Sequence, residues 1–361
     1  MTTKRALLNC VVLVSSLGLS LAGAYYAYKH LTGPPPEVVY RGKANEYAVS
    51  FYSQRGEPLS ELDGGLKIMT DPFVIYRTYP NQRSISYSID KHGFREGHTS
   101  DKPRTAMILG GSVAFGQGLD RNEQTFASRL SHDNEKYNVI NAGVVGFLSG
   151  QELSQMVHYL DDFRPSLYIT FDGWNDIFDP HMFSSTWPVD HGPIGFNNAF
   201  FMIENRLAAY YETDKTKAHR QAQSVKPVGN LMSESDYSQK VIEKYLANIQ
   251  KMWSFARARD AALVVVFQPE LTNKKIKSEE EKRILEAWNT THRYLDKEIP
   301  TKYRALIRAG KALCTKWRMP CLDINEEAEF SEARQSLFDD VVHPNQRGHE
   351  IIARILKRLL D

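Results

Sequence analysis

Short apolar runs alternate with longer amphipathic segments along the last two thirds of the chain. The runs have the length and composition of buried strands, and the segments between them repeat apolar residues at helical spacing. The runs are residues 105–109, 137–140, 167–171, 263–267 and 321–324, and the predicted helices cover 122–132, 150–162, 238–259, 278–309 and 345–359. Such alternation predicts a parallel sheet joined by right-handed crossovers. We therefore expect an α/β fold, a three-layer α/β/α domain with a central parallel five-stranded sheet.

The part of the chain before this domain carries a different pattern, in which short strands alternate with turns. The run 73–77 is apolar, and residues 84–89 alternate apolar and polar side chains, so a strand is predicted at each place. Residues 90–95 have turn chemistry, and we interpret His92 and Arg95 as parts of a structural turn rather than as substrate contacts. This part is predicted to be a small β-rich lead-in beside the sheet.

The N-terminus holds a long apolar stretch. Residues 6–28 are long enough to cross a bilayer, and they follow Lys4 and Arg5, a basic pair that favours an inward N-terminus. The small residues 22–24 have the form of a signal-peptidase site, but the apolar character continues past them. We therefore favour an uncleaved anchor over a cleaved signal. A single N-terminal transmembrane helix would then hold the main domain on the exported, extracytoplasmic side of the membrane.

These patterns divide the chain into three parts. Residues 1–32 form the membrane anchor or signal, residues 33–103 the spacer and lead-in, and residues 104–361 the main domain, with an insertion at 177–237. A chain of 361 residues with 42% apolar side chains is large enough to bury one such core. The formal net charge of +2 provides no basic field that would recommend nucleic acid as a partner.

The cysteines bear on the redox compartment. Cys10 lies inside the predicted span, whereas Cys314 and Cys321 lie at the end of a predicted helix and the start of the next strand. An exported domain would allow these two to form a disulfide if their Cβ atoms approach each other. Because so few cysteines make a poor disulfide framework, we favour two buried thiols.

Two short motifs far apart in the chain supply a serine, a histidine and an aspartate. Ser112 directly follows the first apolar strand, and Gly110 and Gly111 allow a sharp turn that exposes its hydroxyl at the carboxyl edge of the sheet. Asp340 precedes His343 by about one turn, so its carboxylate can accept the Nδ1 proton and leave Nε2 facing a serine. The three are a candidate nucleophile, base and orienting acid. Taken alone, each motif also fits a turn or a helix cap.

Two further motifs end strands at the same edge of the sheet. Gly146 lies in a glycine loop after the strand at 137–140, and Asn175 follows the strand at 167–171. Acyl transfer from a serine needs donors aimed at the developing oxyanion, and a backbone N–H with a side-chain amide meets that need. Separately, Gly146 fits a turn with positive φ, and Asn175 fits a helix cap.

In this order, the four motifs resemble those of the SGNH (GDSL-type) hydrolase superfamily of esterases, lipases and carbohydrate acetylesterases. The resemblance covers residues 105–360. It implies Ser112 as the nucleophile, His343 as the base with Asp340 as its partner, and an oxyanion hole made by the Ser112 N–H, Gly146 and Asn175. The usual Gly-Asp-Ser is here Gly110-Gly111-Ser112, as in many membrane-anchored bacterial relatives. Neither a metal nor a cofactor is implied.

The insertion at 177–237 is rich in aromatic residues and directly follows Asn175, so we expect it to roof the site and to set substrate choice. Trp174 and Trp187 are candidate substrate contacts, and Gln268 borders the same crevice after a core strand. Alternatively, the aromatic residues form the small core of a lid or rest on the membrane surface. The histidines of the insertion lack a carboxylate or a third ligand at recognisable spacing, so no metal site is expected.

The resemblance, the apolar N-terminus and the aromatic insertion together predict a membrane-tethered serine esterase. It would hydrolyse O-acyl esters, in particular O-acetyl esters, on a cell-surface or exported polysaccharide through an acyl-enzyme. One alternative is a lipase or lysophospholipase that takes its substrate from the bilayer, and another is an O-acyltransferase of the same mechanism. A non-catalytic glycan-binding or assembly protein is an alternative of another class, against which the combination of Ser112, His343 and Asp340 argues. The oligomeric state is left open.

Overall fold

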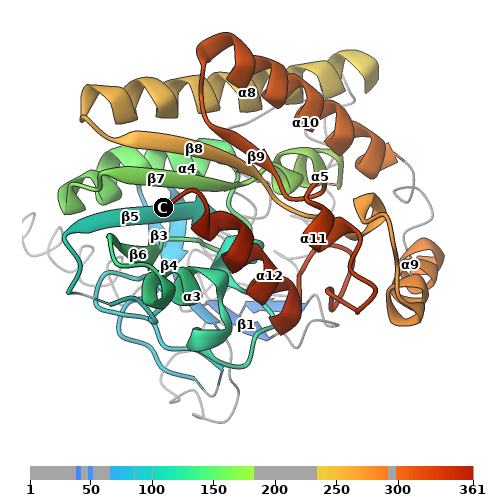
Figure 1. The fold of residues 1–361 in the computed structure, drawn as a ribbon, viewed down its shortest axis with the longest axis horizontal. Coiled ribbons are helices and arrows are strands. Elements are labelled where there is room, and N and C mark those ends of the chain that lie inside the picture. The colour runs from blue at the N-terminus through green and yellow to red at the C-terminus, as the bar shows by residue number, and fades with distance from the viewer. Residues whose placement is uncertain are drawn as a thin grey trace, which may run out of the picture. The chain divides into compact units, whose positions relative to one another are not determined.

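The computed structural model describes residues 38–41, 48–51, 66–84, 86–99, 101–182, 234–291 and 298–360. Its core is a parallel sheet of five strands in the order β6-β5-β7-β8-β9 (Figure 1). The strands are β5 (Arg104–Gly110), β6 (Tyr137–Asn141), β7 (Leu167–Asp172), β8 (Ala262–Phe267) and β9 (Cys321–Asp323). Every residue of β7 is buried, as expected for a central strand that is covered on both faces. The prediction of a parallel five-stranded sheet is confirmed.

Helices cover both faces of this sheet. They are α2 (Ser112–Phe115), α3 (Phe126–Asp133), α4 (Ser149–Gln155), α5 (Trp174–Met182), α8 (Glu234–Ala258), α9 (Glu279–Thr291), α10 (Glu298–Trp317), α11 (Ala328–Ser331) and α12 (Gln346–Lys357). The connection from β5 to β6 crosses the sheet in one direction, and the connections to β7, β8 and β9 cross it in the opposite direction. Because each crossover is right-handed, α3 lies on one face of the sheet, and α4, α8 and α10 lie on the other. α12 packs beside α3, and α8 packs against α4 and α10 (Figure 1). The predicted α/β/α layering is confirmed.

Two predicted helices differ in detail from those in the structure. The segment predicted as one helix at 150–162 is α4 followed by a π-helical turn, η3 (Met156–Leu160), and a 3₁₀ turn, η4 (Asp161–Phe163). The segment 278–309 corresponds to α9 and α10, on either side of residues 292–297, which the structure does not describe. Further 3₁₀ turns are η2 (Asn122–Gln124) and η5 (Leu271–Asn273).

The lead-in contains a second sheet, which is antiparallel and has the order β2-β1-β3-β4. Its strands are β1 (Val38–Arg41), β2 (Ala48–Phe51), β3 (Leu66–Asp71) and β4 (Ile75–Thr78). The strand predicted at 84–89 is wrong, because this segment makes only isolated bridges. The Ser84 hydroxyl accepts the backbone N–H groups of Ser86 and Tyr87, both at 3.1 Å, and such local bonds compete with a strand ladder.

Cys314 and Cys321 form a disulfide, so the preference for two free thiols is wrong. α10 ends at Trp317 and the chain returns at once into β9, which brings the two Cα atoms to 6.2 Å. That separation lies within the range that a disulfide spans. The tight return, rather than the number of cysteines in the chain, determines the pairing.

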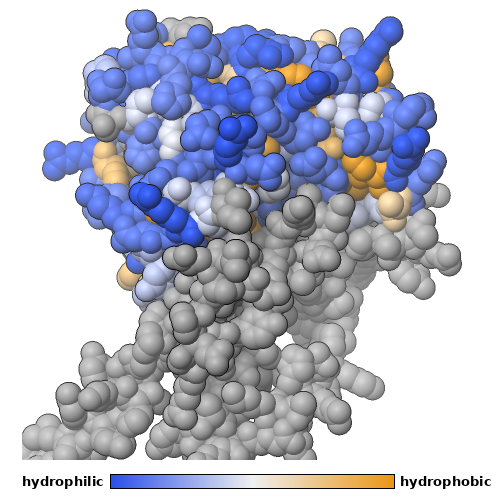
Figure 2. Space-filling model, turned by 90° about the horizontal axis from the view of Figure 1, so that it is seen from below, coloured by the Kyte–Doolittle hydropathy of each residue, from blue (hydrophilic) through white to orange (hydrophobic). Residues whose placement is uncertain are grey.

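On the face that Figure 2 shows, the described surface is mainly hydrophilic and contains several apolar areas. The exposed large apolar side chains include Phe73, Val157 and Trp317. The predicted anchor at 6–28 and most of the insertion, residues 183–233, lie outside the described residues. Within the described part, no helix combines the length and apolar character that a membrane crossing requires.

Candidate active site

Ser112 lies at the carboxyl edge of the sheet, where the strand order reverses. It begins α2 just past the end of β5, and β5 is flanked by β6 on one side and by β7 on the other. Connections leave this point of the sheet in opposite directions, and open α/β sheets form their ligand crevices at such points. The structure thus places Ser112 at the strand end that the sequence indicates.

His343 and Asp340 reach Ser112 from the loop that precedes α12. The Nε2 atom of His343 lies 2.8 Å from Ser112 Oγ, and its Nδ1 atom lies 2.6 Å from Asp340 Oδ2. The other carboxylate oxygen of Asp340 accepts the backbone N–H groups of Val342 at 2.8 Å and of His343 at 2.7 Å. The three side chains therefore form one continuous line of hydrogen bonds.

The surroundings of Asp340 favour its ionised form. Burial alone would raise the pKa of this carboxyl, but the His343 ring and the two backbone N–H groups outweigh burial and hold the pKa below its ordinary value. An ionised Asp340 accepts a hydrogen bond from the Nδ1–H group, and this fixes the tautomer in which Nε2 carries a lone pair. That lone pair faces the Ser112 hydroxyl, so the ring is placed to take the hydroxyl proton.

Two side chains that the sequence analysis did not assign to the site hold α2 in place. The Arg95 guanidinium is buried and donates to the carbonyl oxygens of Phe115 at 3.1 Å and of Gly116 at 2.6 Å. The Nδ2 group of Asn141 donates to a carbonyl oxygen within α2 at 2.9 Å. A cation beside the carbonyl end of a helix is favourable. Arg95 and Asn141 thus fix the short helix that starts with Ser112.

The two candidate oxyanion loops are bonded to each other. Asn175 lies in the first turn of α5, and its Nδ2 group donates one of its two N–H groups to the carbonyl oxygen of Phe147 at 2.9 Å. Gly146 has a φ of +78°, a conformation that favours glycine. The Tyr76 hydroxyl of β4 donates to the Val145 carbonyl oxygen at 2.8 Å. The lead-in sheet therefore supports the glycine loop.

Gly111 makes room for Asn175 beside the nucleophile. The amide nitrogen of Asn175 lies so close to Gly111 that a Cβ atom at this position would collide with it. The Phe147 carbonyl oxygen would also lie only 3.3 Å from that atom. Any residue larger than glycine at 111 would therefore have to displace the Asn175 side chain.

Gly111→Ala is expected to lower kcat for the predicted ester hydrolysis by about 10²-fold, because the added Cβ would displace the amide of Asn175, a candidate oxyanion donor. Steady-state kinetics of Gly111→Ala, Asn175→Ala and the double variant measure the effect. If alanine at 111 acts through Asn175, the double variant is scarcely slower than Asn175→Ala. If the fold-losses of kcat in the two single variants multiply in the double variant, this explanation is contradicted.

Behind the oxyanion loops, three buried carboxyl groups gather between α4, β7 and α5. Asp176 accepts the backbone N–H and the hydroxyl of Ser149, the first residue of α4, at 3.2 and 2.5 Å. Asp172 accepts the hydroxyl of Tyr245 at 2.8 Å. Burial, with the charge of Asp172, raises the pKa of Asp176 to about 7 and that of Glu152 well above its ordinary value. Burial raises the pKa of Asp172 to about 6.

This cluster should make the fold less stable as pH rises. Because the pKa of Asp176 is about 7 in the folded chain and 3.8 ordinarily, only the folded state holds its proton between these values. The free energy of unfolding therefore falls as pH increases through this window. Asp176→Asn removes the titration of this one carboxyl group. From about pH 5 to about pH 8, the free energy of unfolding of the wild type should therefore fall by roughly 2 kcal/mol more than that of the variant.

Urea unfolding of the wild type and Asp176→Asn at several pH values measures this difference. The exposed Glu135→Gln serves as the control and should follow the wild type. Parallel pH profiles for the wild type and Asp176→Asn would show that Asp176 is ionised in the folded chain throughout, contrary to the expectation.

Two of the three predicted substrate contacts, Trp174 and Gln268, are buried in the core. Trp174 is 3% exposed and packs edge-on against Tyr303, with ring centroids 5.4 Å apart. Gln268 is also buried, and its carbonyl oxygen accepts the Tyr303 hydroxyl at 2.8 Å. Both are core positions, whereas Trp187 lies outside the described residues. Contact between substrate and these three residues stays a prediction. Within the described residues, no cluster of histidine, cysteine and acidic side chains is arranged to hold a metal ion.

Comparison with solved structures gives distant likenesses. An acetylxylan esterase from Geobacillus stearothermophilus is 11% identical, with 71% of this chain and 94% of that chain covered and a TM-score of 0.42. A GDSL-like lipase from Bacteroides thetaiotaomicron is 13% identical, with coverage of 73% and 90% and a TM-score of 0.40. An acetyl xylan esterase named AlAXEase is 12% identical, with coverage of 71% and 100% and a TM-score of 0.43. No curated protein sequence is significantly similar.

Likenesses this distant carry no weight in the assignment, which rests on the sequence family. The model of the GDSL-like lipase/acylhydrolase family matches residues 108–351. This range includes the end of β5 before Ser112, both candidate oxyanion loops, the loop with Asp340 and His343, and half of α12. The match spans more than half of the chain. The protein therefore belongs to the GDSL-like lipase/acylhydrolase family and is a hydrolase that acts on esters.

Proposed function

We propose that the protein is a serine esterase in which Ser112, His343 and Asp340 form the catalytic triad. The observation that carries this proposal is the unbroken line of hydrogen bonds from Asp340 through His343 to Ser112, with contacts of 2.6 and 2.8 Å. A structural role does not require a buried serine, a buried histidine and a partly exposed aspartate bonded in that order. General-base activation of a serine does require them.

The reaction follows from the direction of these bonds. His343 Nε2 takes the proton of the Ser112 hydroxyl as Oγ bonds to the carbonyl carbon of the ester, and the C=O electrons move onto the carbonyl oxygen. The Ser112 N–H, the Gly146 N–H and the second N–H of Asn175 donate to that oxyanion. Collapse of the intermediate breaks the ester C–O bond, and His343 gives its proton to the leaving alcohol. Water then cleaves the acyl-enzyme with the same base, regenerating Ser112.

The substrate that we propose is an O-acylated, in particular O-acetylated, polysaccharide outside the cytoplasm. The apolar residues 6–28 support a membrane-tethered, exported domain, and the disulfide between Cys314 and Cys321 suits an oxidising compartment. The aromatic side chains of the insertion at 177–237 suit sugar rings, which bind well against aromatic faces. An acylated lipid of the same bilayer is the competing substrate.

Hydrolysis of p-nitrophenyl acetate, butyrate and palmitate by the purified full chain, beside acetylated xylan and a lysophospholipid, tests this proposal. We expect turnover of acetate and release of acetate from xylan, both lost in Ser112→Ala. Preference for palmitate and the lysophospholipid would replace the polysaccharide by a lipid substrate. A folded protein with no serine-dependent hydrolysis of any ester would contradict the serine esterase itself.

A further inference from the structure

A fully buried ion pair lies outside the triad, at the start of α9. The Nζ atom of Lys274 is 2.7 Å from Glu281 Oε2, and both side chains are 0% exposed. Among the ion pairs in the described part of the chain, this pair alone has two fully buried partners. Burying two charges has a large desolvation cost, so such a pair adds little net free energy of unfolding. Its remaining hydrogen bonds show what the pair holds together.

The bonds of Glu281 go in two directions. Oε2 accepts the backbone N–H of Ser278 at 2.8 Å, and the Ser278 hydroxyl accepts the N–H of Glu281 at 3.2 Å, a reciprocal capping box that starts α9. Oε1 instead accepts the backbone N–H of Leu337 at 2.8 Å, 56 residues further along the chain. One carboxylate thus joins the start of α9 to the segment that leads into the loop with Asp340 and His343.

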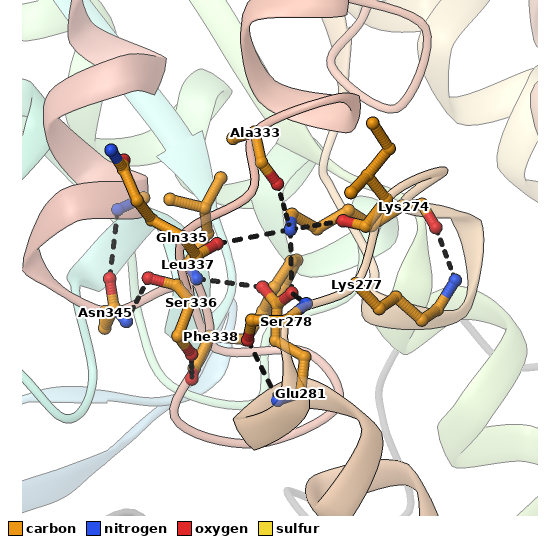
Figure 3. A network of polar contacts seen from close by, with 12 residues as sticks. Lys274, Lys277, Ser278, Glu281, Ala333, Gln335, Ser336, Leu337, Phe338 and Asn345 are labelled. Atoms are coloured by element: carbon orange, nitrogen blue, oxygen red, sulfur yellow. Dashed lines mark hydrogen bonds and ion pairs between the residues drawn. The ribbon is translucent and has the colours of Figure 1, made fainter.

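Lys274 joins the same two segments. Its ammonium group donates to the carbonyl oxygens of Ala333 at 2.7 Å and of Gln335 at 3.3 Å, and to that of Ile276 at 2.6 Å in its own segment. Figure 3 shows the ammonium group between the carbonyl oxygens of Ala333 and Gln335 and the Glu281 carboxylate, with Leu337 bonded to the other side of that carboxylate. The pair therefore bonds the backbone at three places within residues 333–337.

This segment forms the base of the loop that carries two triad members. The Leu337 carbonyl oxygen accepts the N–H of Asn345 at 2.8 Å, and the Asn345 side chain donates to the Ser336 carbonyl oxygen at 3.0 Å. Phe338 and Pro344 form a bridge just inside these bonds. The two ends of the loop are thereby closed against each other, and the loop is held to the domain through Lys274 and Glu281.

We propose that Lys274 and Glu281 are positioning residues, which set the place of the His343 ring relative to Ser112 through the segment 333–337. The inference rests on the proposed triad. A fixed anchor matters there, because general-base catalysis needs the ring nitrogen within hydrogen-bond reach of the hydroxyl. A displacement of about 1 Å in a reacting group can reduce rates by roughly 10²-fold.

The test compares variants of the full chain that separate this role from the capping of α9. Lys274→Met/Glu281→Gln removes both charges at similar volume, so neither partner is left as an unpaired buried charge. Glu281→Asp keeps the charge but withdraws the carboxylate from the Leu337 N–H, and it replaces the double variant if that protein does not fold. Ser278→Ala is the matched control, because it removes the capping hydroxyl and leaves the bond to Leu337.

Kinetics with p-nitrophenyl acetate should show kcat lowered about 10- to 100-fold in the double variant, with KM within about threefold of the wild type. Ser278→Ala should keep kcat within about twofold. Both are measured well below each variant's melting temperature. Wild-type kcat in the folded double variant would overturn the proposal, and so would an equal loss of kcat in Ser278→Ala.

A second readout does not depend on turnover. The Nδ1 proton of His343, bonded to Asp340, should give a strongly downfield proton resonance in the wild type, and the resonance should be shifted or lost in the double variant but kept in Ser278→Ala. If hydrolysis does not depend on Ser112, the proposed triad fails and the positioning proposal fails with it. If hydrolysis depends on Ser112 but kcat and the resonance are unchanged in the double variant, only the positioning proposal fails.

Discussion

Ser112→Ala should lower kcat for p-nitrophenyl acetate by about 10⁴-fold or more, while the melting temperature stays close to that of the wild type. In the proposed mechanism the hydroxyl oxygen bonds to the substrate carbonyl carbon, so its removal closes the acyl-enzyme route altogether. In the structure its oxygen bonds to His343, and alanine loses that one contact without opening a cavity. Steady-state kinetics and thermal unfolding of the same preparation measure both effects.

The triad should also behave as a unit. His343→Ala is expected to cost nearly as much as Ser112→Ala, and the double variant should be no slower than either single variant, because each substitution already disables the same step. Losses that multiply in the double variant would mean that Ser112 and His343 act in separate steps, contrary to the mechanism. Both single variants must remain folded for the comparison to count.

Asp340→Asn should lower kcat by about 10⁴-fold and leave the fold intact. Asparagine can still accept the N–H groups of Val342 and His343 through one oxygen, so the loop keeps its shape. Its NH₂ group, however, would face Nδ1 as a donor and favour the tautomer that carries the proton on Nε2. That ring cannot take the proton from Ser112, so catalysis fails although the geometry survives.

Asp339→Asn is the matched control for this substitution. Asp339 is the adjacent acid, and burial together with the charge of Asp340 raises the pKa of its carboxyl to about 6. In the part of the chain that the structure describes, the side chain of Asp339 makes no hydrogen bond to His343. We expect Asp339→Asn to keep kcat within a few fold of the wild type. A larger loss of kcat in Asp339→Asn than in Asp340→Asn would contradict the mechanism. It would show that Asp339, and not Asp340, orients the His343 ring.

The sheet was predictable because its signal is local. β5, β7 and β8 contain apolar runs, and their burial follows these runs closely, as in β7, where all six residues are buried. The position of Ser112 at a strand end follows from the same run and the two glycines after it. The pairing of Asp340 with His343 was predictable because their spacing alone brings the two side chains within reach.

The parts that were not predictable depend on contacts between distant segments. Nothing near Arg95 in the sequence indicates that its guanidinium is buried under the end of α2, because its acceptors there are backbone carbonyl groups 20 and 21 residues away. The bond between Glu281 and Leu337 is of the same kind. The disulfide was missed because its formation depends on how tightly the chain turns between α10 and β9. The strand predicted at 84–89 failed because the Ser84 hydroxyl competes for the backbone.

Labelling of the full chain with a fluorophosphonate tests the central claim most directly. An activated serine displaces fluoride and forms a stable bond between Oγ and phosphorus, and mass spectrometry of the peptides locates it. We predict one phosphonyl group on Ser112, with ester hydrolysis lost in proportion to labelling. No label should appear in Ser112→Ala, and labelling should be slow in Asp340→Asn. A label on another residue, or hydrolysis that persists after Ser112 is fully labelled, would contradict the assignment of Ser112 as the activated nucleophile.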